Sequence, residues 1–179
     1  MKNYEIFNSS TAPESTRSLL DGVEKSMGLV PNLLGIMATS KPVLSSYLAL
    51  SDFFSKTSLS PIEQQVVLLS VSKENECGYC LAAHSMLARN IAKMDAQTIE
   101  QLKTNAPIEN PKLNALAVFT RHVVATRGNV SDLEITNFLS QGYDQRQILE
   151  VILGVSMKTL SNYINHIAKT PIDDAFLSK

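Results

Sequence analysis

The sequence predicts an all-α fold on three observations. Helix-capping residues recur along the whole chain, and apolar residues repeat at helical spacing. The sustained alternation that is typical of a half-buried strand is almost absent. A multi-helix bundle follows, as a single domain over residues 1–179, because a chain of this length suits one continuous hydrophobic core.

The first helices are predicted from capping signals and proline. Thr11 with Glu14 resembles a capping box, which opens a helix that reaches about Met27. Gly28 then offers a stop. Two further helices follow, a short apolar one at residues 32–37 and a longer one at 41–55.

The clearest helix start is a capping box at Ser60 and Glu63. The run at 66–71 is apolar nearly all round, which predicts a buried central helix that ends near Asn75. A buried parallel strand is the rival interpretation. Helix is favoured because a capping box precedes the run and no turn cluster does.

The second half of the chain is predicted to be helical throughout. Alanine, leucine and methionine are abundant at 79–89, which favours a helix that begins at the cysteine pair itself. Ser131 and Asp144 repeat the capping pattern. The remaining helices are expected at 95–103, 111–126, 131–140 and 144–167.

Composition limits the possible partners and location. With 16 basic and 17 acidic side chains, no net field favours nucleic acid or an anionic membrane. The N-terminus lacks the apolar region of a secretory signal and no apolar run is long enough to cross a bilayer, so the cytoplasm is expected. In a reducing compartment the single Cys-x-x-Cys pair is catalytic or metal-binding more often than structural.

The chemistry is predicted to centre on Cys77, Cys80 and His84. Cys80 falls in the first turn of its helix, where unpaired N–H groups and the helix dipole lower a thiol pKa. His84 is one turn further along the same face and leans toward the sulfur, where it accepts the thiol proton when neutral or holds the thiolate when charged. Cys77 can form a disulfide once Cys80 is oxidised to a sulfenic acid or a mixed disulfide.

Several roles stay open from the residues alone. The helix dipole also permits Cys77 as the attacking thiol, and the position of His84 favours Cys80. Tyr79 either passes a proton or packs its helix. Glu74 either orients His84 or is a surface carboxylate.

Other interpretations of the cysteine pair are weighed against redox chemistry. His122 or His166 would have to complete a zinc site, because the motif alone supplies three ligands. Both cysteines can instead be inert core residues of a helical interaction protein. A c-type haem is excluded since Leu81 follows Cys80. Scattered methionines are core filler or line an apolar entrance, namely Met27, Met37, Met86, Met94 and Met157.

Two segments resemble a known family. The runs LSPIEQQVV at 59–67 and NECGYCLAAH at 75–84 are similar to the alkyl hydroperoxidase D-like (AhpD-like) branch of the carboxymuconolactone decarboxylase superfamily. PNL at 31–33 and the segment from Gly142 to His166 resemble the flanks in these proteins. The decarboxylase members work without this cysteine pair, so the resemblance points to redox chemistry.

The resemblance implies an oligomeric AhpD-like bundle, a homotrimer or hexamer. It implies an antioxidant peroxidase or disulfide oxidoreductase that reduces alkyl hydroperoxides, needs no cofactor or metal and takes electrons from a lipoyl-protein or thioredoxin-like reductant. By position, Cys80 is the peroxidatic thiol, Cys77 the resolving thiol and His84 the base. The family's relay glutamate is Gln65 here, which cannot accept a proton at neutral pH. Glu74 and Tyr79 are the hypothetical substitutes, with Gln65 supplying hydrogen bonds alone.

Overall fold

The computed structural model describes residues 4–177, so both ends of the predicted 1–179 domain, and most of the N-terminus inspected for a signal, lie outside it. Within this range the chain forms ten helices and no strand, which confirms the all-α prediction. The helices are α1 Glu14–Met27, α2 Asn32–Met37, α3 Lys41–Ser55, α4 Pro61–Glu74, α5 Gly78–Asn90, α6 Ala96–Thr104, α7 Pro111–Ala125, α8 Asp132–Ser140, α9 Gln145–Ala168 and α10 Asp174–Leu177.

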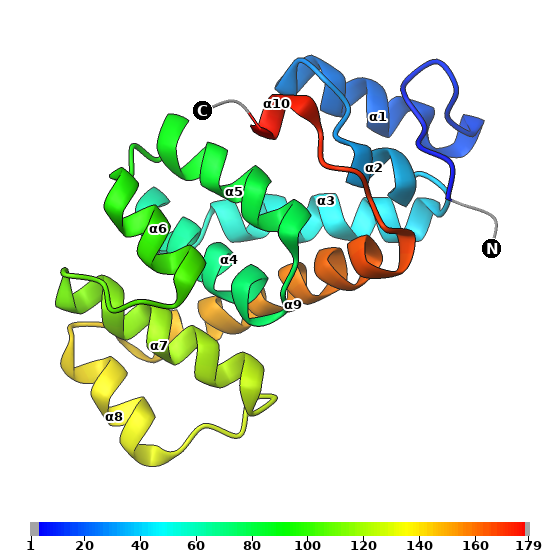
Figure 1. Cartoon of the computed structure of the whole chain (residues 1–179). Helices are drawn as coiled ribbons and strands as arrows, with labels where there is room; N and C mark the ends of the chain where they lie inside the picture. The colour runs from blue at the N-terminus through cyan, green and yellow to red at the C-terminus, as the bar shows by residue number, and fades with distance from the viewer. Residues whose placement is uncertain (1–3, 178–179) are drawn as a thin grey trace.

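Helix α4 is the centre of the bundle (Figure 1). It packs against α5, α6, α7 and α9, and its residues 66–72 are buried. Its N-terminus has the capping box predicted at Ser60 and Glu63, in which each side chain bonds the other's backbone N–H. The 66–71 run is therefore a buried helix and not a strand.

The capping prediction at Thr11 is wrong, because α1 begins only at Glu14, although it reaches Met27 as expected. Pro13 is the N-cap, and no side chain caps this helix. The Asn8 side-chain oxygen accepts hydrogen bonds from the backbone N–H groups of Ser10 and Thr11, which makes a separate turn before the helix. A capping box at Thr11 would need the Thr11 N–H to bond the Glu14 side chain. In the structure this N–H bonds Asn8 instead, so the same residue types form a turn and not a cap.

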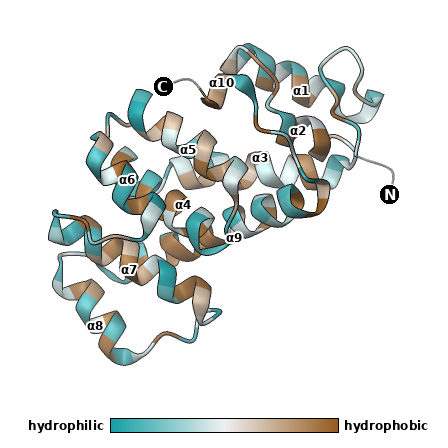
Figure 2. Ribbon diagram, in the orientation of Figure 1, coloured by the Kyte–Doolittle hydropathy of each residue, from teal (hydrophilic) through white to brown (hydrophobic). Residues whose placement is uncertain are grey.

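The buried apolar residues form two clusters. The larger joins α4 to α6, α7, α8 and α9, and the second lies among α1, α2, α3 and α5 and includes both cysteines. Figure 2 shows α2 as mostly hydrophobic, whereas hydrophobic and hydrophilic residues alternate along α6 and α8. Phe176 of α10 belongs to the second cluster. This four-residue helix was not predicted, because it is too short to show a periodic pattern. Among the residues described, no helix is both long and apolar enough to cross a membrane.

Candidate active site

The turn between α4 and α5 places both cysteines at a helix N-terminus. Glu76 has a positive φ of 54°, and Cys77 follows as the N-cap of α5. The Cys77 N–H donates to the Ser72 carbonyl at 2.8 Å, which ties the start of α5 to the end of α4. Cys80 lies in the first turn of α5, as predicted, and both thiols are free and 1% exposed.

The sulfur atoms face a polar stripe on α9. Asn165 donates from Nδ2 to Cys80 Sγ at 3.2 Å and to Cys77 Sγ at 3.7 Å. Ser161 Oγ lies 4.0 Å from Cys80 Sγ. The stripe consists of buried side chains at helical spacing on one face, namely Lys158, Ser161, Asn162 and Asn165. We call these four residues the α9 polar face.

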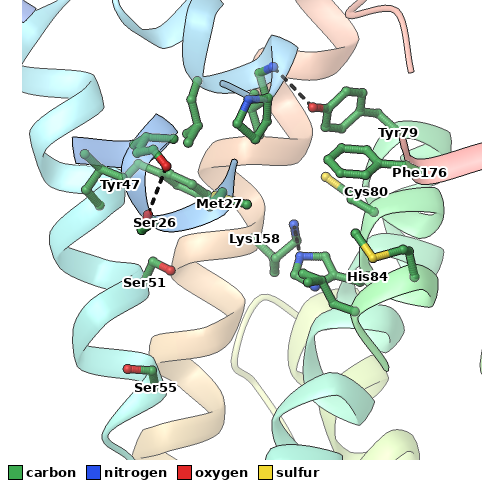
Figure 3. A pocket seen from close by; sticks show the side chains of 18 of the residues that line it. Ser26, Met27, Tyr47, Ser51, Ser55, Tyr79, Cys80, His84, Lys158 and Phe176 are labelled. Atoms are coloured by element: carbon green, nitrogen blue, oxygen red, sulfur yellow. Dashed lines mark hydrogen bonds between the residues drawn. The ribbon is translucent and has the colours of Figure 1, made fainter. Parts of the chain in front are cut away.

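His84 is held between two hydrogen-bond partners. Lys158 Nζ lies 3.1 Å from His84 Nε2 (Figure 3). On the other side of the ring, Gln65 Oε1 lies 3.0 Å from Nδ1. An ammonium group only donates, so Nε2 accepts and Nδ1–H donates to Gln65. Burial and the Lys158 charge hold the pKa of His84 well below its usual range. The imidazole is therefore neutral, and the cation beside the sulfur is Lys158 instead of a charged His84.

The two thiols have opposite electrostatic environments. A hydrogen bond from Cys77, followed by the charge of Lys158, outweighs burial and lowers the pKa of Cys80 to about 5. The hydrogen bond to Cys80, burial and the Cys80 charge raise the pKa of Cys77. At neutral pH Cys80 is a thiolate, and Cys77 keeps the proton that it shares with it.

Neither proposed substitute for the relay glutamate contacts His84. The Tyr79 hydroxyl donates to Asp173 Oδ2 at 2.6 Å and accepts from the Leu33 N–H at 3.3 Å. Burial and Asp173 raise the pKa of Tyr79. Glu74 acts electrostatically on Arg121 of α7, and both ring nitrogens of His84 already have other partners. The hypothesis that Glu74 orients His84 is therefore replaced by Gln65, which supplies the expected hydrogen bond.

A cavity of about 390 Å³ opens onto Cys80. Its wall includes Cys80, His84 and Lys158 (Figure 3). Cys77 is not part of this wall. The other walls are mainly apolar and come from α1, α2, α3, α5 and α10. Met27 and Met86 line this cavity, but the other three methionines considered from the sequence do not. Cys80 is therefore the cysteine that borders the mainly apolar cavity.

The histidines considered as zinc ligands do not complete a metal site with the cysteine pair in the described residues. His122 contacts Glu134 across α7 and α8, and His166 is exposed on α9. Over residues 4–177, no group of three or more His, Cys, Asp or Glu side chains is arranged to hold a metal ion.

Sequence reasoning missed Lys158, Ser161, Asn162, Asn165 and Asp173. The first four carry a signal, because they are polar residues that fall on one face of a helix at spacings of three or four positions. Asp173 carries none, since it lies in a loop 94 residues from Tyr79.

Comparison with known proteins identifies the fold. No protein-family model matches the sequence, and no curated protein does. Among solved structures, the chain is similar to a peroxidase-related protein from Ralstonia eutropha JMP134 described as an alkylhydroperoxidase AhpD core, with a TM-score of 0.86, 21% identity and coverage of 97% of this chain and 93% of that one. A peroxidase-related protein from Silicibacter sp. TM1040 gives 0.83 and 19%, covering 99% and 96%.

A third similar structure is a cysteine-to-alanine variant of the debrominase Bmp8 in complex with 2,3,4-tribromopyrrole. It has a TM-score of 0.82 at 13% identity and covers 99% of this chain and 95% of that one. At these identities the likeness concerns the fold. With ten helices over residues 4–177 and the cysteine pair at the start of α5, the chain has the AhpD-like fold.

Proposed function

We propose that this protein is a thiol-dependent oxidoreductase that reduces organic hydroperoxides, with Cys80 as the attacking thiol and Cys77 as the resolving thiol. One observation carries the proposal. Cys80 is the cysteine on the cavity wall and the one with the lowered pKa, whereas Cys77 lies behind it and keeps its proton. The mainly apolar walls favour an alkyl or aryl hydroperoxide over hydrogen peroxide.

The cycle has three steps. The Cys80 thiolate attacks the terminal peroxide oxygen, so that an S–O bond forms, the O–O bond breaks and the alcohol leaves after protonation. Cys77 then attacks the sulfenic sulfur, the disulfide forms and water leaves with the Cys77 proton. An external dithiol, which we propose to be a lipoyl-protein or thioredoxin-like reductant, regenerates both thiols.

Peroxide consumption by wild type, Cys77→Ser and Cys80→Ser tests the assignment. We expect Cys80→Ser to lose turnover, and Cys77→Ser to accumulate a sulfenic acid on Cys80 that mass spectrometry detects after trapping. Trapping on Cys77 in the Cys80→Ser variant would reverse the two roles. Comparing cumene hydroperoxide with hydrogen peroxide tests the preference for an organic substrate.

Reductive debromination is a second candidate, because the AhpD-like structures include a debrominase and the aromatic rings of Tyr79 and Phe176 line the cavity beside Cys80. The Cys80 thiolate would attack bromine, so that an S–Br bond forms and the C–Br bond breaks. The carbon would take the Cys77 proton, and the Cys77 sulfur would displace bromide as the disulfide forms. Bromide release from 2,3,4-tribromopyrrole, with no turnover of cumene hydroperoxide, would favour this reaction over the first.

Assembly as a homo-oligomer, a trimer or hexamer, is also proposed. The outer face of α9 carries exposed apolar side chains, namely Leu149, Ile152, Tyr163 and Ile167. Light scattering of the purified protein measures the subunit number, and a monomer would contradict this proposal.

A further inference from the structure

Lys158 is a buried cation whose counter-charge is a sulfur atom. It is 1% exposed, and no carboxylate within residues 4–177 forms an ion pair with it. Its Nζ donates to neutral His84, and it interacts electrostatically with the Cys80 thiolate. A buried ammonium group is unfavourable without an opposite charge, so the thiolate stabilises Lys158 as much as Lys158 stabilises the thiolate.

The proposed peroxide step needs a proton donor inside the cavity, since an alkoxide is a poor leaving group. His84 does not qualify, because its Nε2 has no hydrogen and its Nδ1–H is bonded to Gln65. The Tyr79 hydroxyl donates to Asp173. The Cys77 proton is needed later to release water. Lys158 is left, with a charged donor on the cavity wall next to the attacking sulfur.

We propose that Lys158 is the catalytic acid of the peroxide step, and that it gives up this proton on oxidation and regains it when the disulfide is reduced. The inference rests on the function proposed above and deepens it. His84 is then a positioning residue, which accepts a hydrogen bond from Lys158 and aims its ammonium group. Gln65 fixes the imidazole in turn.

Atoms and charge balance over the oxidative half of the cycle. The reactants are the Cys80 thiolate, the Cys77 thiol, the Lys158 ammonium and one hydroperoxide. The products are the disulfide, the neutral Lys158 amine, one alcohol and one water. A reducing dithiol then supplies two protons and two electrons, so that one proton returns to Cys77 and the other to Lys158 while Cys80 becomes a thiolate again.

The environment of Lys158 favours this loss of charge. Its titratable neighbours are the two cysteines, His84 on α5 and Tyr47 on α3. Asp52 also lines the cavity, but it is exposed and paired with Lys56. Once the disulfide has consumed the thiolate, no anion balances the buried ammonium, and burial favours the neutral amine.

The pH dependence of the disulfide reduction potential tests the proposal without any peroxide. The potential is measured against a dithiol buffer between about pH 6.5 and 8, where Cys80 is ionised and Cys77 is not. After the pH dependence of the dithiol buffer itself is subtracted, each proton that the protein takes up changes the equilibrium constant of its two-electron half-reaction tenfold per pH unit, about 30 mV. We expect a hundredfold change per unit in wild type, because two protons enter on reduction.

The matched variant is Lys158→Arg, which keeps the charge but does not release a proton at these pH values. It should show a tenfold change per pH unit with the thiolate absorbance preserved. A tenfold change in wild type, with peroxide turnover intact, would overturn the role of Lys158 and leave the proposed function standing. Failure to form any reversible disulfide would overturn both.

A second measurement separates proton donation from stabilisation of the thiolate. Lys158→Met keeps a similar apolar volume, and its rates with cumene hydroperoxide and with a peroxy acid are compared with those of wild type. The carboxylate leaving group of a peroxy acid needs no proton, whereas an alkoxide does. We expect the hydroperoxide rate to fall by about 100-fold more than the peroxy acid rate, which is typical of a lost general acid. An equal fall with both substrates would contradict acid catalysis by Lys158.

Discussion

The two halves of α9 bury different kinds of residue. The first half buries Val151, Gly154 and Met157 against the apolar core, and the second half buries the α9 polar face against the two sulfurs. The same helix therefore fixes the packing at one end and supplies the chemistry at the other. The difference indicates that substitutions in the first half affect stability, whereas those in the second half affect the thiolate.

Gly154 explains why the first half is sensitive to side-chain size. A Cβ atom at this position would lie 2.7 Å from a ring carbon of Phe54 and 2.8 Å from a methyl group of Val67. Both neighbours are buried, in α3 and α4 respectively. The absence of a side chain at Gly154 lets α3, α4 and α9 meet closely.

The largest expected effect is from Gly154→Val. The added methyl groups overlap with Phe54 and Val67, so we expect unfolding to become easier by about 2 to 3 kcal/mol, typical of overpacking. Urea unfolding followed by circular dichroism measures the change, and the Cys80 pKa in the folded fraction is the control. Unchanged stability would contradict the view that the first half of α9 serves packing and the second half serves the chemistry of the thiolate.

The reverse behaviour is expected of Asn165→Leu in the second half. This change removes the donor at 3.2 Å from Cys80, and a hydrogen bond to a charged group corresponds to a pKa rise of about one to two units. At pH 4, where Cys80 is mostly protonated and its pKa no longer contributes to stability, unfolding should change little, because leucine is similar in size and Asn165 Oδ1 is already buried without a partner. Thiolate absorbance against pH gives the pKa. A loss of stability with no change in the Cys80 pKa would mean that Asn165 contributes to packing and not to the thiolate.

The pH dependence of wild type is the third prediction. Because the pKa of Cys80 is lowered to about 5, the thiolate is present above this pH and is lost as pH falls below it. Alkylation of Cys80 should therefore level off above about pH 6 and fall about tenfold per unit below pH 5. Peptide mass spectrometry distinguishes Cys80 from Cys77. A midpoint near pH 8.5, the pKa of an ordinary thiol, would contradict the claim that the second half of α9 stabilises the Cys80 thiolate.

Local signals account for the part of the fold that the sequence predicts. The box at Ser60 and Glu63 and the cysteine pair at the start of α5 depend on residues a few positions apart, so spacing alone locates them. Cys77 and Cys80 are likewise only three positions apart, so their proximity can be predicted from the sequence. The Thr11 prediction failed although it was local, because the Asn8 turn competes for the same backbone groups.

The cation of the site was not predictable in this way. Lys158 is 78 positions after Cys80 in the chain, and its place beside the sulfur depends on how α9 packs on α5. A lysine in a helix is usually exposed, so residue type argued against burial. The sequence shows that the polar residues from Lys158 to Asn165 share one face of a helix, but only the fold shows that this face is buried.

The smallest expected effect is from Ser161→Ala, which sharpens the comparison within the α9 polar face itself. Ser161 Oγ donates to the Lys158 carbonyl at 3.0 Å, and its contact with Cys80 Sγ is long, at 4.0 Å. The hydroxyl is thus bonded within its own helix, and its loss leaves Lys158 and Asn165 in place. We expect the Cys80 pKa to change by less than about 0.5 units, compared with one to two for Asn165→Leu. An equal shift in both variants would mean that the sulfur responds to the polarity of the whole face instead of to the close donors at Lys158 and Asn165.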